Sequence, residues 1–197
     1  TIFPINAYHI HFNKMMQIQY SAAKTTDELQ QILLLQKENL RHKNDVEEER
    51  EQGFVTVQHD IELLTKMNQI APHIIATDGD NVIGYALAMT KHFRDEIPVL
   101  HSMFVLLDDL MVEDKKLGTE NFLVMGQICI DKNYRGKGIF QGLYAHYFQL
   151  YKPNYTYIIT EVAERNVRSL QAHFKVGFKD VHRYDEPGFE TWVVLMY

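Results

Sequence analysis

A glycine-containing turn between two apolar runs is the part of the sequence best suited to chemistry. Residues 121–130 read as a strand, Arg135-Gly136-Lys137-Gly138 as a turn, and a helix is predicted to begin directly after it. Glycine permits backbone conformations that other residues avoid and lets a ligand approach the main chain. The first N–H groups of a helix lack intrahelical acceptors, and the helix dipole adds partial positive charge. Together with the charges of Arg135 and Lys137, this segment predicts a diphosphate-binding site.

Two other phosphate-binding patterns do not fit the same residues. A P-loop needs Gly-x-x-x-x-Gly-Lys-Ser/Thr, and the sequence has no such spacing. A dinucleotide fingerprint needs a third glycine three residues after Gly138, where this chain has Gln141. One plainer alternative stays open: on these four residues alone, the turn could simply join a strand to a helix.

The elements around the turn follow an α/β pattern. Helices are predicted from helical periodicity at 26–41, 59–70, 138–151 and 166–176, and a further short helix between Pro98 and Met111, before a charged loop at 113–118. Strands are predicted at 16–22, 73–77, 81–90, 121–130, 155–160, 178–184 and 189–197. The strand–helix–strand order in the middle makes 121–130 and 155–160 parallel neighbours, so we expect an α/β protein with a mixed sheet.

Local signals support several of these boundaries. Thr25-Thr-Asp-Glu28 has the spacing of a capping box, and Asn166 is a good cap for the last helix. The acidic segment 44–53 is predicted to be a solvated short helix or loop. Residues 78–81 predict a hairpin turn, and Gly84 in the following strand indicates a bulge or a close backbone approach.

The composition is that of an ordinary soluble globular protein. The chain has 197 residues, 46% of them apolar and 23% charged, which favours one domain, predicted over 16–197 after an N-terminal extension at 1–15. The net charge of −6 does not favour nucleic acid or an anionic membrane as partner. No apolar run reaches the ~18 residues of a membrane span, and no leader is evident, so the cytoplasm is the expected location. The single cysteine, Cys129, is expected to be a small buried hydrophobe rather than a nucleophile.

The turn and two later segments resemble the GNAT superfamily of acyl-CoA-dependent N-acetyltransferases. The cofactor motif of that superfamily is Arg/Gln-x-x-Gly-x-Gly/Ala; Arg135 and Gly138 match it, whereas Phe140 stands where Gly or Ala is usual. Residues 166–169 and 173–178 look like the next helix of the family and its terminal Gly-Phe. The resemblance implies a GNAT-like α/β fold, with a mixed, mostly antiparallel central sheet, a splayed parallel pair of strands and flanking helices.

The resemblance also implies acetyl-CoA as co-substrate, with no metal. It assigns the pantetheine arm to backbone groups of Gln127, Ile128, Cys129 and Ile130. It assigns the pyrophosphate to the N–H groups of Arg135, Gly136, Lys137, Gly138, Ile139 and Phe140. Asn166 and Ser169 would lie beside the pantetheine, and for Asn166 this is compatible with its role as a helix cap.

The expected reaction is direct attack of an amine on the thioester, which needs a base and often an acid. The family commonly has a tyrosine acid four residues before the terminal glycine, and this chain has His173 there. Its imidazole could donate the proton, or it could be a packed histidine bonded to a backbone carbonyl. Glu161 is the preferred base; Glu120, Asp131 and an ordered water are the alternatives.

The acceptor is expected to be a small-molecule or peptide amine. Its groove would be lined by the first helices and by residues 91–120. That segment contains His92, Phe93, His101, Phe104, Asp108 and Asp109. A non-catalytic acyl-CoA binding or sensing module is the main rival, because His173 replaces the tyrosine and no base is obvious.

Two partner questions remain. Nucleic-acid binding through 132–137 is poorly supported by one short basic stretch on an acidic chain. The apolar closing strand at 192–197 could pair with a second copy in a homodimer, or it could simply be core.

Overall fold

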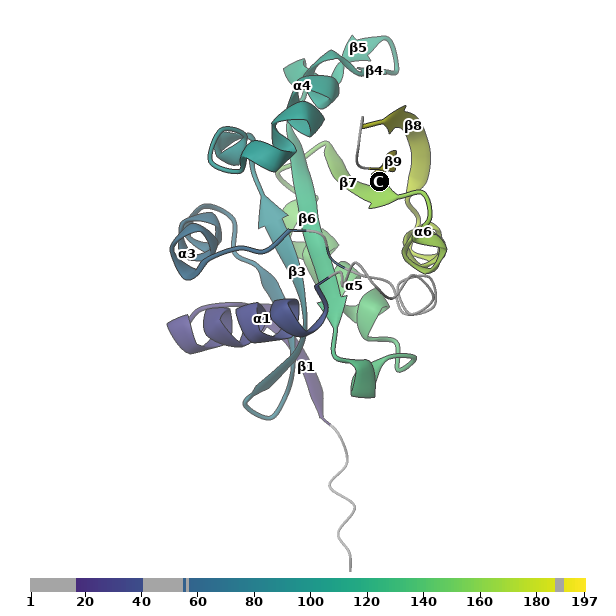
Figure 1. The fold of residues 1–197 in the computed structure, drawn as a ribbon. Coiled ribbons are helices and arrows are strands. Elements are labelled where there is room, and N and C mark those ends of the chain that lie inside the picture. The colour runs from purple at the N-terminus through teal and green to yellow at the C-terminus, as the bar shows by residue number, and fades with distance from the viewer. Residues whose placement is uncertain (1–16, 41–54, 56, 187–189) are drawn as a thin grey trace, which may run out of the picture.

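The computed structural model describes residues 17–40, 55, 57–186 and 190–197. The predicted extension at 1–15 and the acidic segment 44–53 lie outside these ranges, and the domain boundaries stay a prediction. The described residues form one large sheet with helices on both of its faces (Figure 1).

The large sheet has seven strands in the order β1-β2-β3-β6-β7-β9-β8. The strands are β1 Ile18–Ala22, β2 Ile74–Asp78, β3 Asn81–Met89, β6 Phe122–Ile130, β7 Tyr157–Ala163, β8 Lys179–Asp185 and β9 Thr191–Met196. β6 and β7 pair in parallel, and every other neighbouring pair is antiparallel. The predicted mixed, mostly antiparallel sheet with one parallel pair is confirmed.

Helices cover the two faces of this sheet (Figure 1). The α-helices are α1 Thr26–Glu38, α3 Ile61–Ile70, α4 His101–Asp109, α5 Ile139–Tyr151 and α6 Val167–Lys175. Short 3-10 helices occupy Lys91–Phe93, Pro98–Leu100, Leu117–Thr119 and Lys132–Tyr134. Alternate residues of β3 pack on opposite sides, with Tyr85 and Leu87 in the cluster under α1 and α3, and Ala86 and Ala88 in the cluster under α5.

The helices begin where the sequence predicts. Thr25 and Glu28 form the expected capping box: the Thr25 hydroxyl accepts from the Glu28 N–H at 3.2 Å, and the Glu28 carboxylate accepts from the Thr25 N–H at 2.8 Å. Asp60 caps α3 by accepting from the Leu63 N–H at 2.8 Å. Gly84 lies beside a register shift in the pairing of β2 with β3, and a Cβ on it would lie 3.2 Å from the Cys129 carbonyl, so both readings of this glycine hold.

Two elements differ from the prediction. β7 continues to Ala163 rather than ending at 160, so Glu161 lies within the strand instead of after it. The expected loop at 113–118 contains a hairpin of β4 (Met111–Val112) and β5 (Lys115–Lys116). Its turn places Glu113 and Asp114 at φ 48° and 65°. Turns with two left-handed residues usually contain Asn-Gly or Asp-Gly. This turn has Glu-Asp instead, so the sequence did not predict the hairpin.

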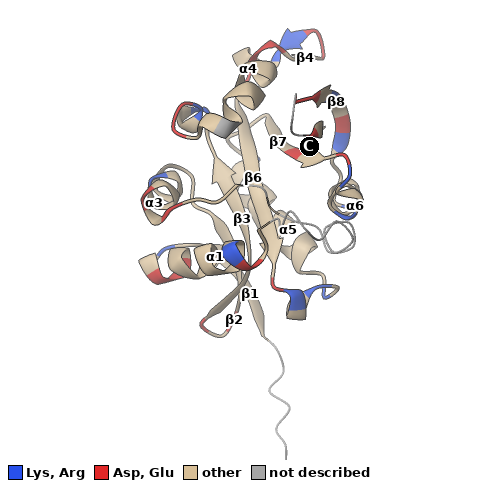
Figure 2. Ribbon diagram, viewed as in Figure 1, with Lys and Arg blue, Asp and Glu red and all other residues tan. Residues whose placement is uncertain are grey.

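The closing strand β9 is interior to the sheet. It pairs with β7 on one side and β8 on the other, and Val193, Val194 and Leu195 are fully buried. The core alternative for this strand is therefore confirmed. The edge strand at this end of the sheet is β8, which carries charges of both signs (Figure 2). Such an edge resists pairing with another chain, and the homodimer stays a prediction.

Among the described residues, none of the helices is both long and apolar enough to cross a bilayer. In the same part of the chain, no group of three or more His, Cys, Asp or Glu side chains is arranged to hold a metal ion.

Candidate functional site

The sheet opens between β6 and β7. Their parallel pairing runs only from Phe122 opposite Tyr157 to Val124 opposite Ile159. Beyond that point β6 stays paired with β3 and β7 with β9, and the two central strands diverge (Figure 1). A bulge at Gly126 shifts the register of β6 just after the split. The opening leaves the β7-facing edge of β6 available to a ligand.

Two adjoining cavities occupy this opening. The first has a volume of about 580 Å³ and is walled by the end of β6, the turn at 134–138, the start of α5 and one side of α6. The second has a volume of about 340 Å³ and lies against the split strands, α4 and the ends of β8 and β9. Val55, Ile128, Asn166 and Ser169 line both, so the cavities meet at the split.

The turn before α5 presents backbone rather than side chains. Gly136 and Gly138 have φ values of 75° and 77°, which favour glycine. A Cβ on either residue would meet nothing within 4 Å, so conformation and not packing requires glycine here, and the space beside the turn stays open. Gly138 is the N-cap of α5, and Ile139 and Phe140 line the first cavity from its first turn. The N–H groups of that turn have no intrahelical acceptor and suit an anion.

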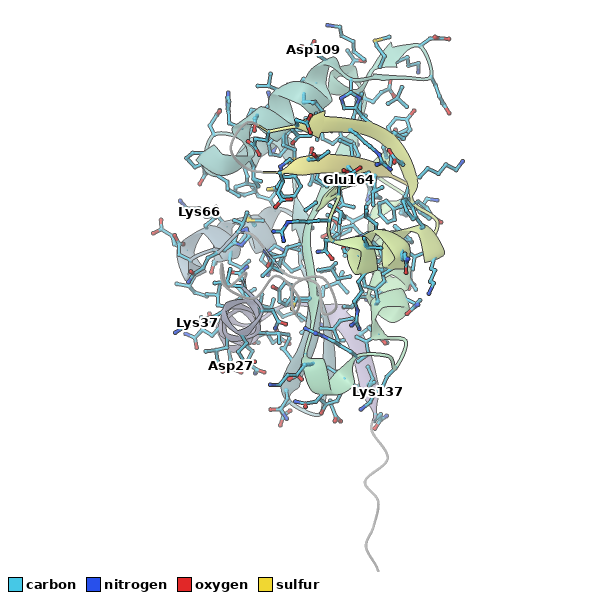
Figure 3. The ribbon with its side chains drawn as sticks, turned by 45° about the vertical axis from the view of Figure 1, so that its right-hand side comes forward. Asp27, Lys37, Lys66, Asp109, Lys137 and Glu164 are labelled. Atoms are coloured by element: carbon cyan, nitrogen blue, oxygen red, sulfur yellow. The ribbon has the colours of Figure 1, made fainter. Side chains whose placement is uncertain are left out.

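The two basic residues of the turn lie differently. Arg135 lines the first cavity, where its guanidinium donates to the Ile130 carbonyl at 3.3 Å and to Asn39 Oδ1 at 2.6 Å. It thereby ties the turn to the end of α1 while keeping its charge at the cavity wall. Lys137 does not line either cavity; its ammonium lies 4.9 Å from the centre of the Tyr134 ring, at the outer end of the turn (Figure 3).

The predicted pantetheine strand lies along both cavities. Ile128, Cys129 and Ile130 line the first cavity, and Gln127 and Ile128 line the second. Burial raises the pKa of the Cys129 thiol to about 12, so the thiol stays protonated at neutral pH. This environment agrees with the expectation that Cys129 is a buried hydrophobe.

Gln127 belongs to a buried polar network that sequence reasoning missed. Its Oε1 accepts from the Tyr85 hydroxyl at 2.6 Å and from Gln36 Nε2 at 2.7 Å, and its Nε2 donates to the Val57 carbonyl at 2.9 Å. Gln36 also contacts His59, through Nε2 to Nδ1 at 2.9 Å. Burial lowers the pKa of His59 to about 4, so the ring is neutral and Nδ1 can accept. The network fixes the segment around Val57 over β6.

Glu161 reaches the second cavity from β7. Its Oε2 accepts from the Tyr184 hydroxyl at 3.0 Å, while Oε1 is buried and has no hydrogen-bond partner among the residues described. Burial raises the pKa of the Glu161 carboxyl to about 8; the negative charge of Glu186 adds to the increase, and the Tyr184 hydrogen bond opposes it. A carboxylate of this pKa exchanges protons near neutral pH, which suits a general base.

Two more carboxylates line the same cavity and were missed from the sequence. Glu186 accepts from the Ser102 hydroxyl at 2.9 Å and from Trp192 Nε1 at 3.0 Å. Glu190 forms an ion pair with Arg165 at 2.6 Å. Both glutamates lie between the two closing strands in the sequence, and this position could have identified them as candidates. No nearby sequence feature, however, indicated that β9 would insert beside β7.

His173 is buried at the side of the second cavity. Its side chain is 1% exposed and packs edge-on against Phe140, Tyr144 and Phe178, with ring centroids 5.1 to 5.5 Å apart. Nδ1 lies 2.7 Å from the Ser169 carbonyl, and burial lowers the pKa of the ring to about 4. Because a carbonyl only accepts, Nδ1 carries the proton of the neutral ring and Nε2 is an acceptor.

This geometry matches the packed-histidine alternative. Donation of a proton from Nε2 would require the charged ring, which burial disfavours. The contact with His173 also explains Phe140, because its ring fills space beside the imidazole while its backbone N–H stays in the first turn of α5.

Asn166 and Ser169 lie at the junction of the two cavities. The Asn166 side chain accepts from the Ser169 N–H at 3.2 Å and so caps α6 as predicted. Their position beside both cavities is compatible with the predicted place next to a bound pantetheine.

The residues predicted for the acceptor groove are mostly placed elsewhere. None of the six residues named from 91–120 lines the second cavity; that segment contributes Leu100, Ser102 and Met103 instead. Phe93 and Phe104 are buried in the core, because their large apolar rings are more stable there than at a wet groove.

The carboxylates of that segment are used in surface ion pairs. Asp108 pairs with Arg94 at 2.8 Å. Asp109 pairs with Lys116 at 2.7 Å and lies at the opposite end of the molecule from Lys137 (Figure 3). The alternative bases are also remote, since neither Glu120 nor Asp131 lines either cavity.

Comparison with known proteins agrees with this architecture. A family model described as the acetyltransferase (GNAT) family matches residues 27–178, more than half of the chain. The protein therefore belongs to the GNAT acetyltransferase family, as the resemblance of its motifs implied. No curated protein matches the chain.

Solved structures show the same fold at low sequence identity. The ribosomal-protein alanine N-acetyltransferase from Escherichia coli is 14% identical, with a TM-score of 0.58 over 91% of this chain and 92% of that chain. Arabidopsis thaliana NAA60 in complex with acetyl-CoA is 14% identical, with a TM-score of 0.62 over 92% and 99%. The protein yncA from Salmonella typhimurium, with its cofactor acetyl-CoA, is 11% identical, with a TM-score of 0.60 over 91% and 92%.

Proposed function

We propose that this protein is an N-acetyltransferase that moves the acetyl group of acetyl-CoA to a primary amine by direct attack. The observation that carries the proposal is the continuous path along the split between β6 and β7. It runs from the turn at Gly136–Gly138, past the open edge of β6, to the carboxylate of Glu161.

The residues of the first cavity fit the cofactor. The N–H groups from Arg135 to Phe140 would hold the pyrophosphate, because the turn leaves open space beside them and the helix dipole favours negative charge. The pantetheine arm is an extended chain with amide groups, and the unpaired backbone edge at 127–130 offers it the hydrogen bonds of an added strand. When bound this way, acetyl-CoA supplies the activated thioester.

Glu161 would accept a proton from the acceptor ammonium. The amine nitrogen then forms the new bond to the acetyl carbon while the bond from that carbon to sulfur breaks. Of the two protons that the nitrogen loses, one passes through Glu161 to solvent and the other leaves on the thiol. Tyr184 holds the Glu161 carboxylate in place through its hydroxyl. His173 remains beside the site as an acceptor; its predicted role as the acid would require the protonated ring.

A turnover assay tests the proposal. The protein is mixed with acetyl-CoA and a panel of primary amines, and release of free thiol is compared with formation of the acetylated amine by mass spectrometry. We expect amine-dependent release that is lost in Glu161→Gln. Glu164→Gln is the matched control, because Glu164 is on the surface in an ion pair with Arg183 and lines neither cavity (Figure 3). Binding of acetyl-CoA without turnover of any amine would instead support the non-catalytic sensing module.

Other parts of the assignment stay predictions. The acceptor is a small-molecule or peptide amine in this proposal, the location is the cytoplasm, and a homodimer remains to be tested by measurement of the mass in solution.

A further inference from the structure

The second cavity has an excess of negative charge. Among the described residues that line it there are three glutamates, Glu161, Glu186 and Glu190, and no lysine or arginine. The charge of Glu190 is compensated by its ion pair with Arg165. Glu161 and Glu186 line the same cavity, and the charge of Glu186 raises the pKa of the Glu161 carboxyl. Two carboxylates therefore face one small cavity, whereas a single base is sufficient for amine acetylation.

Glu186 is positioned by neutral groups. The Ser102 hydroxyl on α4 donates to its Oε1 at 2.9 Å, and the Trp192 indole on β9 donates to its Oε2 at 3.0 Å. Neutral donors fix the direction of a carboxylate without cancelling its charge. Glu186 is thus a carboxylate of fixed orientation at the wall of the cavity, held from two separate elements.

Glu161 gives an independent indication that this space receives a ligand. Its Oε1 is buried and has no hydrogen-bond donor among the described residues, although buried polar atoms are almost always paired. When Glu161 is ionised, a ligand N–H is the group that this oxygen lacks. The walls of the same cavity include the apolar side chains of Leu100 and Met103 and the Trp192 ring. Such a surface suits the methylene groups of a ligand.

We propose that the acceptor is a dication: one ammonium lies at Glu161 and is acetylated, while a second cationic group binds Glu186 across an apolar spacer. This inference rests on the proposed function, because it assigns the substrate class of the same site. It makes Glu186 a specificity residue, which selects the acceptor but takes no proton from it. Acetylation removes one of the two positive charges, so the product loses its attraction to Glu161 and keeps only that to Glu186.

Calorimetry with matched amines tests the inference directly. Cadaverine, a five-carbon diamine, and n-pentylamine, which lacks its second ammonium, are titrated into the full chain saturated with CoA. We expect cadaverine to bind at least about tenfold more tightly, since a hydrogen-bonded charge pair contributes roughly 1.5–3 kcal/mol and 1.4 kcal/mol is a factor of ten.

Three variants locate the effect. Glu186→Gln should bring the two dissociation constants to within about twofold of each other, because the second ammonium of cadaverine then has no charged partner. Ser102→Ala keeps the charge and should retain most of the preference. Glu164→Gln, a surface change, should retain all of it. Circular dichroism and melting temperature confirm that each variant is folded.

Equal binding of the two amines by the wild-type protein would overturn the inference, and so would a preference that survives in Glu186→Gln. Turnover is measured on the same protein preparations with acetyl-CoA in place of CoA, so the two proposals can fail separately. Acetylation of both amines without a preference rejects only the dication. A preference for cadaverine that depends on Glu186, without acetylation of any amine, supports the dicationic ligand and rejects the acetyltransferase.

Discussion

Replacing Glu161 with Gln is expected to remove activity and, at alkaline pH, to make the folded protein more stable. Burial raises the pKa of this carboxyl from 4.5 to about 8. The folded state therefore holds the proton between these two pH values, while the unfolded state releases it. Because the unfolded state binds fewer protons in this range, the free energy of unfolding falls as the pH rises from 4.5 toward 8. The Glu161→Gln variant has a neutral amide at this position and escapes this loss.

The size of the effect follows from the same pKa. At about 1.4 kcal/mol per pH unit, the wild-type protein would lose at most about 4 kcal/mol relative to Glu161→Gln between pH 5 and pH 8. The cavity admits solvent to part of the side chain, so we expect about 1–2 kcal/mol. Any constant cost of burying the new amide is the same at both pH values and cancels in the difference.

Urea unfolding at pH 5 and pH 8 measures this difference, with Glu164→Gln as the surface control. Activity should show the same ionisation: kcat of the wild type should rise about tenfold per pH unit below pH 8 and then level off, apart from a further rise near pH ~10 where the amine itself ionises. The limb near pH 8 should be absent in Glu161→Gln. A stability difference that does not change between the two pH values would refute the assignment of a raised pKa and, with it, the role of Glu161 as base.

Three other substitutions or measurements test neighbouring parts of the account. Tyr184→Phe removes the hydrogen bond that favours the ionised Glu161, so the pKa of Glu161 should rise further and the limb of the kcat profile should move to higher pH; an unchanged limb would contradict the contact. Gly142→Ala places a Cβ 2.1 Å from the ring of Tyr20 and should lower the free energy of unfolding, measured in urea, by about 1–3 kcal/mol. The same substitution should cost much less when it is made in a Tyr20→Ala background, where the ring is absent. Nitrogen NMR should show the His173 ring neutral and protonated on Nδ1 down to about pH 5, because burial lowers its pKa to about 4; a charged ring at pH 6 would restore it as a candidate acid.

The turn and helix start at the proposed phosphate-binding end of the site could be predicted because their determinants are local. A strand, two glycines at positive φ and a helix start occupy one continuous stretch around Gly136 and Gly138. The capping residues Thr25 and Asn166 act on backbone N–H groups within the next few residues, so the helix starts were equally readable. Short-range contacts of this kind are determined by spacing along the chain.

The acceptor end could not be predicted because its residues meet only through the order of the strands. Glu161 becomes the neighbour of Glu186 because β9 inserts between β7 and β8, and sequence spacing does not determine that insertion. In the segment 91–120, six residues were wrongly predicted to line the acceptor groove, because residue type was taken as evidence of position. Its aromatic and acidic residues suit a groove by type, yet Phe104 completes a core and Asp108 an ion pair.

The most direct test of the central claim is binding of acetyl-CoA to the wild-type protein, Gly138→Trp and Gly79→Trp by calorimetry. Gly138 and Gly79 both have positive φ with open space at the Cβ position, so both substitutions carry similar backbone strain, but only Gly138 lines the first cavity. The account predicts micromolar binding by the wild type and by Gly79→Trp, and none by Gly138→Trp at temperatures where all three proteins are folded. Absence of binding by the wild type, or unchanged binding by Gly138→Trp, would contradict the placement of the cofactor at this turn.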